Sequence, residues 1–480
     1  MLLVSGVVRA ADTWTQVRSD HFVVVSNAGE RKARNIAWQF EQVRAAIQQG
    51  FPWAAADLNR PMTIVAAKDE DTLRKLVPEY WEKRGATHPV SVSVSSWDSH
   101  YIAVRTDVEE EGQGQNPYRY AYWSYSALIF DENYNYRLPL WLSDGVATLL
   151  SNTVVSSKEI RFGVPIPEEI EVLKTSPLLP LAQLLTIGRD TPVYQQATSR
   201  ERFTAQCWAL VQFLMFSQQG GGGARLNQLS ALLLAGTPSA EAVQQVYGNL
   251  DALDQAYRLY VNQGIFRFAR LRVDTDVSPA KYPSRSMSPA EGAAAQAGLH
   301  VAMNRPVEAR ALIAQVRAAD PSLAAADDLE AMLLDREKKT DEARAAYAKA
   351  AEHGSKNFWV YYRLASGSAS APADPASLAA AATTLERATT LNPHFAPAFE
   401  YLANVQSRQR QLDRALQTQQ QAVGLEPNDI GHRINLARLL LAANRRDDAV
   451  KVVSEAMPLA RSDQERNLLR TIVPPAVPGR

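Results

Sequence analysis

The chain has 480 residues, with 51 basic and 51 acidic side chains, so its formal net charge is zero. This length exceeds one ordinary domain and predicts at least two. The balanced charge, with no basic stripe, argues against a nucleic-acid partner, and no apolar run reaches the ~20 residues of a membrane-spanning helix.

The N-terminus resembles the end of an export signal. Leu2 to Val8 is apolar, and Arg9-Ala10-Ala11-Asp12 places small residues next to a candidate cleavage point. The run is short and lacks a basic start, so we interpret residues 1–11 as a truncated signal peptide. This favours an exported protein, periplasmic or secreted, with a cytoplasmic protein as the alternative.

Residues 12–275 predict a mixed α and β domain. β-branched or alternating runs predict the following strands: 22–26, 62–67, 90–96, 101–105, 159–162 and 266–273. The third and fourth of these are predicted to pair as a hairpin. Apolar periodicity predicts the following helices: 29–49, 118–131, 140–151, 180–185 and 203–218.

Three shorter features complete this part of the chain. Cys207 is the only cysteine, so it forms no internal disulfide, and its apolar helix predicts a buried, unreactive side chain. The glycine run 220–223 predicts a flexible connector. Residues 276–289, rich in proline and serine, are predicted to be a linker between domains.

Alanines recur at a near-constant interval in the last 190 residues. One ladder, with gaps of 34, 38, 34 and 34, consists of Ala309, Ala343, Ala381, Ala415 and Ala449. A second consists of Ala297, Ala331, Ala365, Ala403 and Ala437, and a third of Val316, Ala350, Ala388, Ala422 and Ala456. Small residues at a fixed period predict repeated helix pairs whose backbones approach closely.

This pattern resembles the tetratricopeptide repeat, whose second helix carries A-x3-F and ends at a proline. Ala343-x3-Tyr347 and Pro427 match it. The resemblance implies an all-α superhelix of about five units over residues 290–463, followed by a helix end and proline-rich tail at 464–480. The 38-residue gap predicts a four-residue insertion within Gly367–Asp374.

A concave face lined by the first helix of each unit is the expected binding surface. The repeat register places on it Trp359, Tyr362, Glu400, Asn404, Asn435 and Arg438. Amides and guanidinium can hold the backbone and carboxylates of an extended peptide. Glu400 stands where the carboxylate-binding form of these repeats has lysine, which argues against specificity for a C-terminal carboxylate.

A second resemblance lies in the N-terminal part. Pro139-Leu140-Trp141-Leu142-Ser143-Asp144-Gly145-Val146-Ala147 resembles the P-x-W-x-x-E-G-x-A element of gluzincin zinc peptidases, in particular the peptidase MA-like families. His21-Phe22-Val23-Val24 and the helix segment Phe203 to Leu210 fit the same families. The resemblance implies an α+β metallopeptidase-like domain over residues 12–275.

The zinc chemistry of those families needs H-E-x-x-H about 17 residues upstream and a third carboxylate ligand. Here Tyr122 and Ser126 occupy the histidine positions and Trp123 that of the catalytic glutamate, while Asp144 replaces the third ligand. The resemblance therefore implies a domain without catalytic residues, metal or cofactor. A site built from His88, His100 and Asp144 is a weaker alternative, as is Ser124 or Ser126 acting as a nucleophile.

The sequence therefore predicts a noncatalytic scaffold that binds a protein or peptide partner through its repeats, joined to an inactive peptidase-like domain. One alternative is a divergent hydrolase that uses other ligands. Another is a structural stack within a larger assembly.

Overall fold

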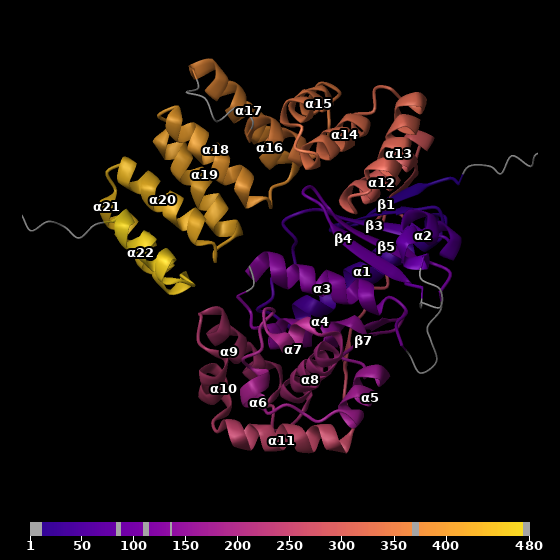
Figure 1. Cartoon of the computed structure of the whole chain (residues 1–480), viewed down its shortest axis with the longest axis vertical. Coiled ribbons are helices and arrows are strands. Elements are labelled where there is room, and N and C mark those ends of the chain that lie inside the picture. The colour runs from indigo at the N-terminus through magenta and orange to yellow at the C-terminus, as the bar shows by residue number, and fades with distance from the viewer. Residues whose placement is uncertain (1–11, 83–87, 109–114, 135–136, 367–373, 474–480) are drawn as a thin grey trace, which may run out of the picture. The chain divides into compact units, whose positions relative to one another are not determined.

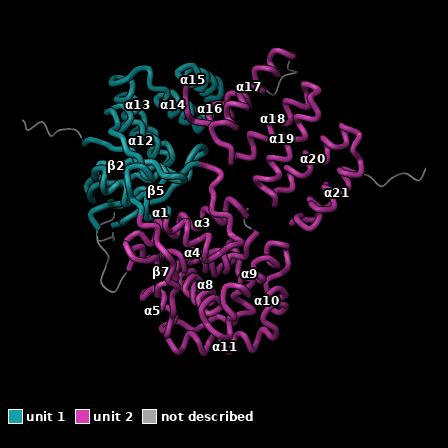
Figure 2. The backbone as a smooth tube through the Cα atoms, turned by 180° about the vertical axis from the view of Figure 1, so that it is seen from behind, with its two compact units in different colours: residues 1–41, 61–109, 276–353 teal, residues 42–60, 110–275, 354–480 magenta. Residues whose placement is uncertain are grey.

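The computed structural model describes residues 12–82, 88–108, 115–134, 137–366 and 374–473. Two compact units make up the chain (Figure 2): unit 1 holds residues 1–41, 61–109 and 276–353, and unit 2 holds 42–60, 110–275 and 354–480. Each unit thus draws on both predicted domains. The predicted signal segment 1–11 and the predicted insertion, apart from Asp374, lie outside the described residues. None of the described helices is long and apolar enough to cross a membrane.

A six-stranded sheet forms the base of unit 1, in the order β4-β5-β3-β2-β1-β9. Its strands are β1 (Thr15–Arg18), β2 (Phe22–Ser26), β3 (Met62–Ala67), β4 (Ser91–Ser95), β5 (His100–Arg105) and β9 (Ser284–Ser286). β2, β3 and β5 run parallel, whereas β4 pairs with β5 as the predicted antiparallel hairpin. The four strands predicted for this region are confirmed.

The predicted linker contains β9, which pairs with β1 antiparallel. Ser284-Arg285-Ser286 is polar and too short for alternation to be visible, and its partner lies more than 260 residues earlier. This pairing adds an edge strand to the sheet, so residues 276–289 are not a free spacer. β1 was also missed, because its four residues carry no clear alternation.

The first repeat helix, α12 (Pro289–Ala302), packs on this sheet. Leu299 and Ala302 join the core formed by the register neighbours Val25, Val65 and Ala103, together with the short helix α2 (Glu70–Leu76). A Cβ atom at Gly298 would lie 2.7 Å from the hydroxyl oxygen of Tyr101, so the helix sits closer to the sheet than any side chain there would permit.

The opposite side of the sheet faces α1 (Glu30–Gly50), whose residues up to Glu41 belong to unit 1. Phe22 and Phe40 meet edge to face with ring centroids 5.6 Å apart, and both side chains are buried. Val24, Ile64 and Ile102 share the face of Phe22 by alternation and register. The sheet is therefore buried on both sides.

Helices form most of the 110–275 part of unit 2. These are α3 (Arg119–Tyr134), α4 (Leu140–Ser151), α5 (Pro167–Thr175), α6 (Leu181–Leu184), α7 (Pro192–Gln195), α8 (Ala197–Phe216), α9 (Gly222–Leu234), α10 (Ser239–Tyr247) and α11 (Leu250–Gln263). A small antiparallel sheet joins β6 (Val154–Val155), β7 (Ile160–Phe162) and β8 (Ala269–Leu271). The long helix α8 is central, since its Cys207, Trp208 and Phe213 are wholly buried.

The glycine run is a tight turn and not the flexible connector that the sequence predicted. Helix α9 begins within it at Gly222, and Gly221 has φ +74°. A Cβ atom at Gly220 would lie 2.1 Å from the carbonyl oxygen of Phe213. Glycine is required here because the α8–α9 turn has a left-handed residue and no room for side chains.

Ten helices form the five predicted pairs (Figure 1). Unit 1 holds α12 with α13 (Pro306–Ala319) and α14 (Ala325–Arg336) with α15 (Thr340–Glu352). Unit 2 holds α16 (Phe358–Ser366) with α17 (Pro375–Leu391), α18 (Ala396–Arg408) with α19 (Leu412–Leu425), and α20 (Ile430–Ala442) with α21 (Arg446–Ala456). Helix α22 (Asp463–Ile472) covers the last pair with its buried Leu469.

The alanine ladders lie at the predicted contacts. Every residue of the second and third ladders is at most 2% exposed, and so are four residues of the first. The remaining one, Ala381 in α17, is partly buried beside Ala382, which is 8% exposed. The helix crossings are therefore closed by methyl groups, as the 34-residue period predicts.

The turn inside four of the five pairs repeats as well. Among the described residues, the non-glycine positions with positive φ are Asn304, Lys338, Arg410 and Asn444, at 56° to 62°. In each case the next N–H donates to the carbonyl five residues earlier, at 2.8 to 2.9 Å. This is a Schellman helix end, and it recurs at the repeat period.

Arg410→Gly should stabilise the protein by about 0.5–1 kcal/mol. A side chain in the left-handed region costs ~1–2 kcal/mol, part of which glycine loses again through its freedom in the unfolded chain. Urea unfolding followed by circular dichroism measures the change. The control Gln420→Gly, at an exposed position in the interior of α19, should destabilise by about 1 kcal/mol. A loss of stability in Arg410→Gly would contradict the assignment of the turn.

Candidate functional site

The positions expected for zinc ligands on α3 belong to the core of unit 2. Tyr122 and Ser126 are fully buried, and the Ser126 hydroxyl donates to the Tyr122 carbonyl oxygen at 2.8 Å. Tyr122 and Tyr118 lie with ring centroids 6.4 Å apart. The Ser126 hydroxyl is thus held against its own helix, which is the usual use of a serine inside a helix.

Asp144 on α4 is buried and weakly paired. Burial raises the pKa of its carboxyl to about 7, while Arg189 and a hydrogen bond with Tyr194 act in the opposite direction. The same side chain was predicted as the only remnant of the ligand set. Near it lies a cavity of about 380 Å³, whose lining includes Asp131, Ser143 and Arg189.

The neighbouring Gly145 has a packing role. A Cβ atom there would lie 2.6 Å from the carbonyl oxygen of Cys207, so α4 and α8 touch backbone to backbone at this point. This helix contact therefore explains the glycine of the Asp144-Gly145 pair in the segment Pro139 to Ala147. Cys207 itself is fully buried, and burial raises the pKa of its thiol, in agreement with the predicted inert role.

Within the described residues, no group of three His, Cys, Asp or Glu side chains is arranged to hold a metal ion. His88, His100 and Asp144, the alternative site, form no such group among these residues either. His100 is fully buried with Nδ1 2.8 Å from the Ser95 hydroxyl, and His88 Nδ1 lies 2.6 Å from a carboxylate oxygen of Glu70.

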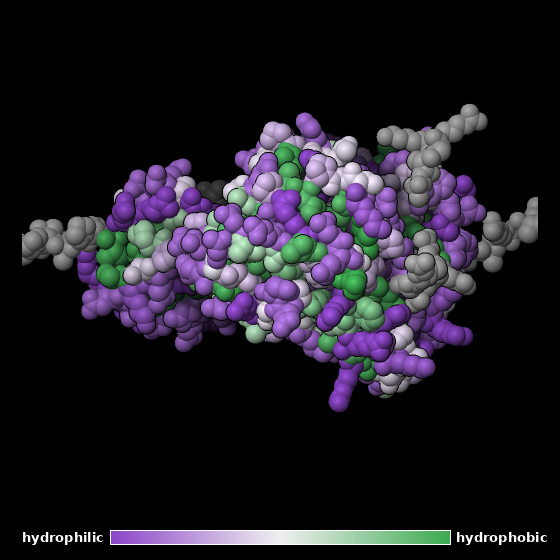
Figure 3. Space-filling view, turned by 90° about the horizontal axis from the view of Figure 1, so that it is seen from below, coloured by the Kyte–Doolittle hydropathy of each residue, from purple (hydrophilic) through white to green (hydrophobic). Residues whose placement is uncertain are grey.

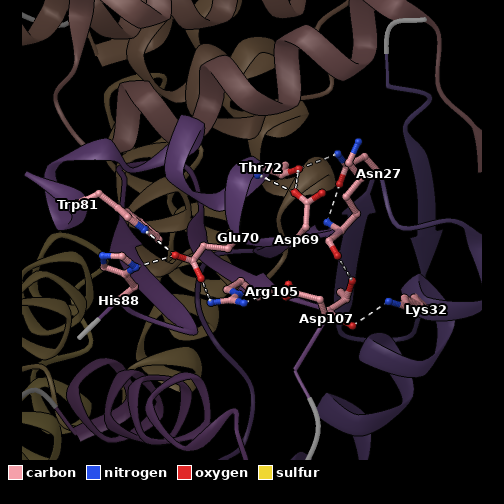
Figure 4. Close-up of polar contacts among 11 residues, drawn as sticks. Asn27, Lys32, Asp69, Glu70, Thr72, Trp81, His88, Arg105 and Asp107 are labelled. Carbon is pink, nitrogen blue, oxygen red and sulfur yellow. Dashed lines mark hydrogen bonds and ion pairs between the residues drawn. The ribbon is translucent and has the colours of Figure 1, made fainter. Parts of the chain in front are cut away.

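A polar cluster that the sequence analysis missed lies in unit 1, where the parallel strands β2, β3 and β5 end (Figure 4). Glu70 accepts a hydrogen bond from Trp81 at 2.9 Å, contacts His88, and pairs with Arg105 at 2.6 Å. These partners lower the pKa of Glu70, the Trp81 hydrogen bond most. Arg105 also binds Asp107 at 2.9 Å. The acids and bases satisfy one another, so the cluster fastens three loops together.

The predicted concave face exists in unit 2 as a groove of about 980 Å³. Helices α16, α18 and α20 supply most of its lining, which includes Tyr362, Glu400, Tyr401, Asn404, Arg408, His432, Asn435, Arg438 and Leu439. Four of the five residues predicted to bind a peptide are thereby brought to one surface. They come from the first helix of successive pairs, which the repeat places side by side.

Trp359, the fifth, packs beside the groove and is not part of its lining. Its ring lies 5.3 Å from that of Tyr362 and 6.1 Å from that of Phe395. Phe395, from the turn between α17 and α18, packs against the Trp359 ring, which is partly exposed. That aromatic contact was outside the repeat pattern and could not be predicted from it.

An ion-paired histidine lies at the groove, and it too was missed. His432 is 6% exposed, with Nδ1 against a carboxylate oxygen of Glu400 and Nε2 3.2 Å from one of Glu426. Burial acts to lower the pKa of His432, but the two carboxylates and Asp429 raise it to about 10. The pKa of Glu400 is lowered, mainly by His432.

Glu400 is therefore ion-paired with a buried histidine, which the sequence analysis did not predict. Glu400 and His432 are 32 positions apart, which is close to the 34-residue repeat. This spacing was the one feature of the sequence that could have predicted their contact. Asn435 also hydrogen-bonds the Glu400 carboxylate. The acidic side chain that seemed to exclude carboxylate ligands is held within the protein.

The face of the molecule drawn in Figure 3 shows small hydrophobic areas separated by hydrophilic residues. This pattern is ordinary for a protein surface and marks no broad apolar docking site on that face.

No protein-family model and no curated protein matches the chain. Among solved structures, it is similar to YrrB, described as a TPR protein with an unusual peptide-binding site, at 19% identity and a TM-score of 0.33, covering 38% of this chain and 92% of YrrB. It is also similar to MamA from Desulfovibrio magneticus RS-1, at 18% identity and a TM-score of 0.30, covering 37% of this chain and 98% of that one.

His432→Gln should remove a pH-dependent part of the stability. Because its folded pKa of about 10 exceeds the unfolded value of 6.5, the histidine stabilises fully below pH 6.5, and the contribution disappears as the pH rises through 10. We expect a loss of about 1–3 kcal/mol at pH 6 that shrinks toward pH 10. Urea unfolding at both pH values measures it.

The matched control is His394→Gln, which changes an exposed histidine at the start of the loop before α18. Its effect should be small and the same at both pH values. A His432→Gln loss that is equally large at pH 6 and pH 10 would show that the ion pair is not its cause.

Proposed function

We propose that the protein is a noncatalytic scaffold that binds an extended segment of a partner protein in the groove of unit 2. The observation that carries this proposal is the groove itself, about 980 Å³ in volume and lined by Tyr362, Asn404, Asn435 and Arg438. Amide, guanidinium and aromatic groups are the side chains that hold peptide backbone, carboxylates and apolar side chains.

We further propose that the five helix pairs are tetratricopeptide repeats. Three independent features support this: the buried alanine ladders, the recurrent Schellman turn, and the contact of each helix with the next inside each unit. Repeats of this kind present the first helices of successive pairs to one surface, which is where the groove lies.

We also propose that the N-terminal region is an inactive relative of the gluzincin peptidases. What supports this is the identity and burial of Tyr122 and Ser126, neither of which offers a ligand atom for zinc. The alternative, a divergent hydrolase, has one observation in its favour: the buried Asp144 carboxyl, whose pKa of about 7 suits proton transfer at neutral pH.

Selection of random twelve-residue peptides against the full chain should yield binders of the groove. Replacing Asn404 and Arg438 together by alanine should weaken their binding about tenfold or more, since two polar anchors are lost. Fluorescence anisotropy with a labelled selected peptide measures the affinity.

The control replaces another amide and another arginine, both on the outer helix α19, as Gln420→Ala with Arg414→Ala, and should leave the affinity unchanged. Binders that lose affinity equally in both double variants would place the binding surface elsewhere. A selection that yields no binder would remove the support for a peptide-binding scaffold.

Zinc analysis tests the N-terminal proposal. Purified protein exposed to zinc and then dialysed should hold well below one zinc ion per chain, since the position of the motif offers one carboxylate and no imidazole. Zinc bound at about one ion per chain and released by Asp144→Ala, or peptide cleavage lost in that variant, would establish the hydrolase instead.

A further inference from the structure

We propose that the groove selects segments with an internal aspartate or glutamate, whose carboxylate lies against Arg438 and Asn404, and with an aromatic side chain about three residues away against Tyr362 and Tyr401. This inference rests on the proposed peptide-binding function and adds the chemistry of the bound segment.

Arg438 and Asn404 occupy the same position of successive repeats. Ser366, Asn404 and Arg438 are separated by 38 and 34 residues, the repeat intervals, and all three line the groove from α16, α18 and α20. A segment lying across these helices meets the three side chains in order. Asn404 and Arg438 are able to donate hydrogen bonds to the same carboxylate, and Ser366 carries a small hydroxyl group.

Glu400, a carboxylate in the groove, has an ion-pair partner within the protein. It is paired with the buried His432, whose second ring nitrogen faces Glu426, so two carboxylates share the one positive charge of His432. Asp429 is a second acidic residue of the lining. The basic side chains of the lining are Arg408, His432 and Arg438.

Arg438 is the best placed of these. Its side chain is exposed in the groove, and in the described part of the chain its guanidinium contacts the Asn435 side-chain oxygen at 3.4 Å and pairs with no carboxylate. Asn404, also exposed, makes no hydrogen bond with any described residue. A guanidinium with an adjacent amide is a site for a carboxylate, since arginine binds it in a planar, two-pronged arrangement.

An apolar surface lies next to this polar pair. Tyr362 and Tyr401 stand edge to face with ring centroids 6.4 Å apart, and Leu439 adds an aliphatic side chain. Such a pair accepts a further aromatic ring in an edge-to-face arrangement. The groove is therefore suited to a peptide segment that carries one acidic and one aromatic side chain.

The distance between helices in the repeat sets the number of residues between the acidic and the aromatic side chain of the ligand. Packed helix axes lie about 8–10 Å apart, and an extended chain advances about 3.3 Å per residue, which makes about three residues for each helix crossed. The tyrosine pair spans α16 and α18, and Arg438 stands on α20. Leu439 and Ala442, further along α20, extend the lining beside Arg438.

The probes are blocked ten-residue peptides of glycine and serine that carry one phenylalanine and one glutamate three residues apart, made in both orders. One order should bind the full chain, and changing its glutamate to glutamine should weaken binding about tenfold. In Arg438→Gln this glutamate-to-glutamine change should have almost no further effect, whereas in the control Arg414→Gln it should again cost about tenfold. Binding should also weaken as salt is raised.

Equal affinity of the glutamate and glutamine peptides for the unchanged protein would overturn the inference. So would binding that needs a free C-terminal carboxylate, or a glutamate effect that survives in Arg438→Gln. Peptides from the unbiased selection separate the two proposals. If those bind the groove without an acidic residue, peptide binding stands and the carboxylate preference falls; if none binds the groove, both fall.

Discussion

Close contact of helix backbones at the alanine ladders is the constraint on which the C-terminal half of the chain depends. At each crossing a methyl group is all that separates two helices, and the third ladder extends this contact two turns further along. A larger side chain at Ala403 or Ala422 would push the helices apart and displace everything they carry. Because the crossings recur at one interval, the first helices of successive pairs line up, and the groove follows from that alignment.

Close packing at residues without a bulky side chain also occurs outside the helix crossings of the repeats. Gly298 lets α12 lie on the sheet of unit 1, and Gly145 lets α4 lie on α8 in unit 2. At Gly145 the missing side chain permits contact between two helix backbones, and at Gly298 it leaves room for the Tyr101 hydroxyl. The repeat series therefore begins inside the core of a mixed sheet structure, and β9, just before α12, completes that sheet.

A contact between neighbouring helix pairs affects the charge of the groove. Glu400 on α18 and His432 on α20 meet because the two helices are adjacent, and the buried histidine keeps its proton because two carboxylates face it. This arrangement gives Glu400 an ion-pair partner within the protein, while Arg438 is exposed in the groove. The ligand chemistry of the surface is thus decided partly by residues beneath it.

The sequence by itself determined the elements with strong local patterns. The parallel strands, the hairpin, the long helices and the five helix pairs were predicted because alternation and the 34-residue period repeat their signal many times. Tyr362, Asn404, Asn435 and Arg438 could be assigned to one surface for the same reason. The wrong or missing predictions include β1, β9 and the glycine turn, where three or four residues carry too little pattern. The helices α2, α5, α9, α10 and α11 were not predicted either. Only the tertiary structure decided that Phe395 packs against Trp359, that His432 pairs with Glu400, and that α12 belongs to the sheet, because each depends on a contact between residues that no local period relates.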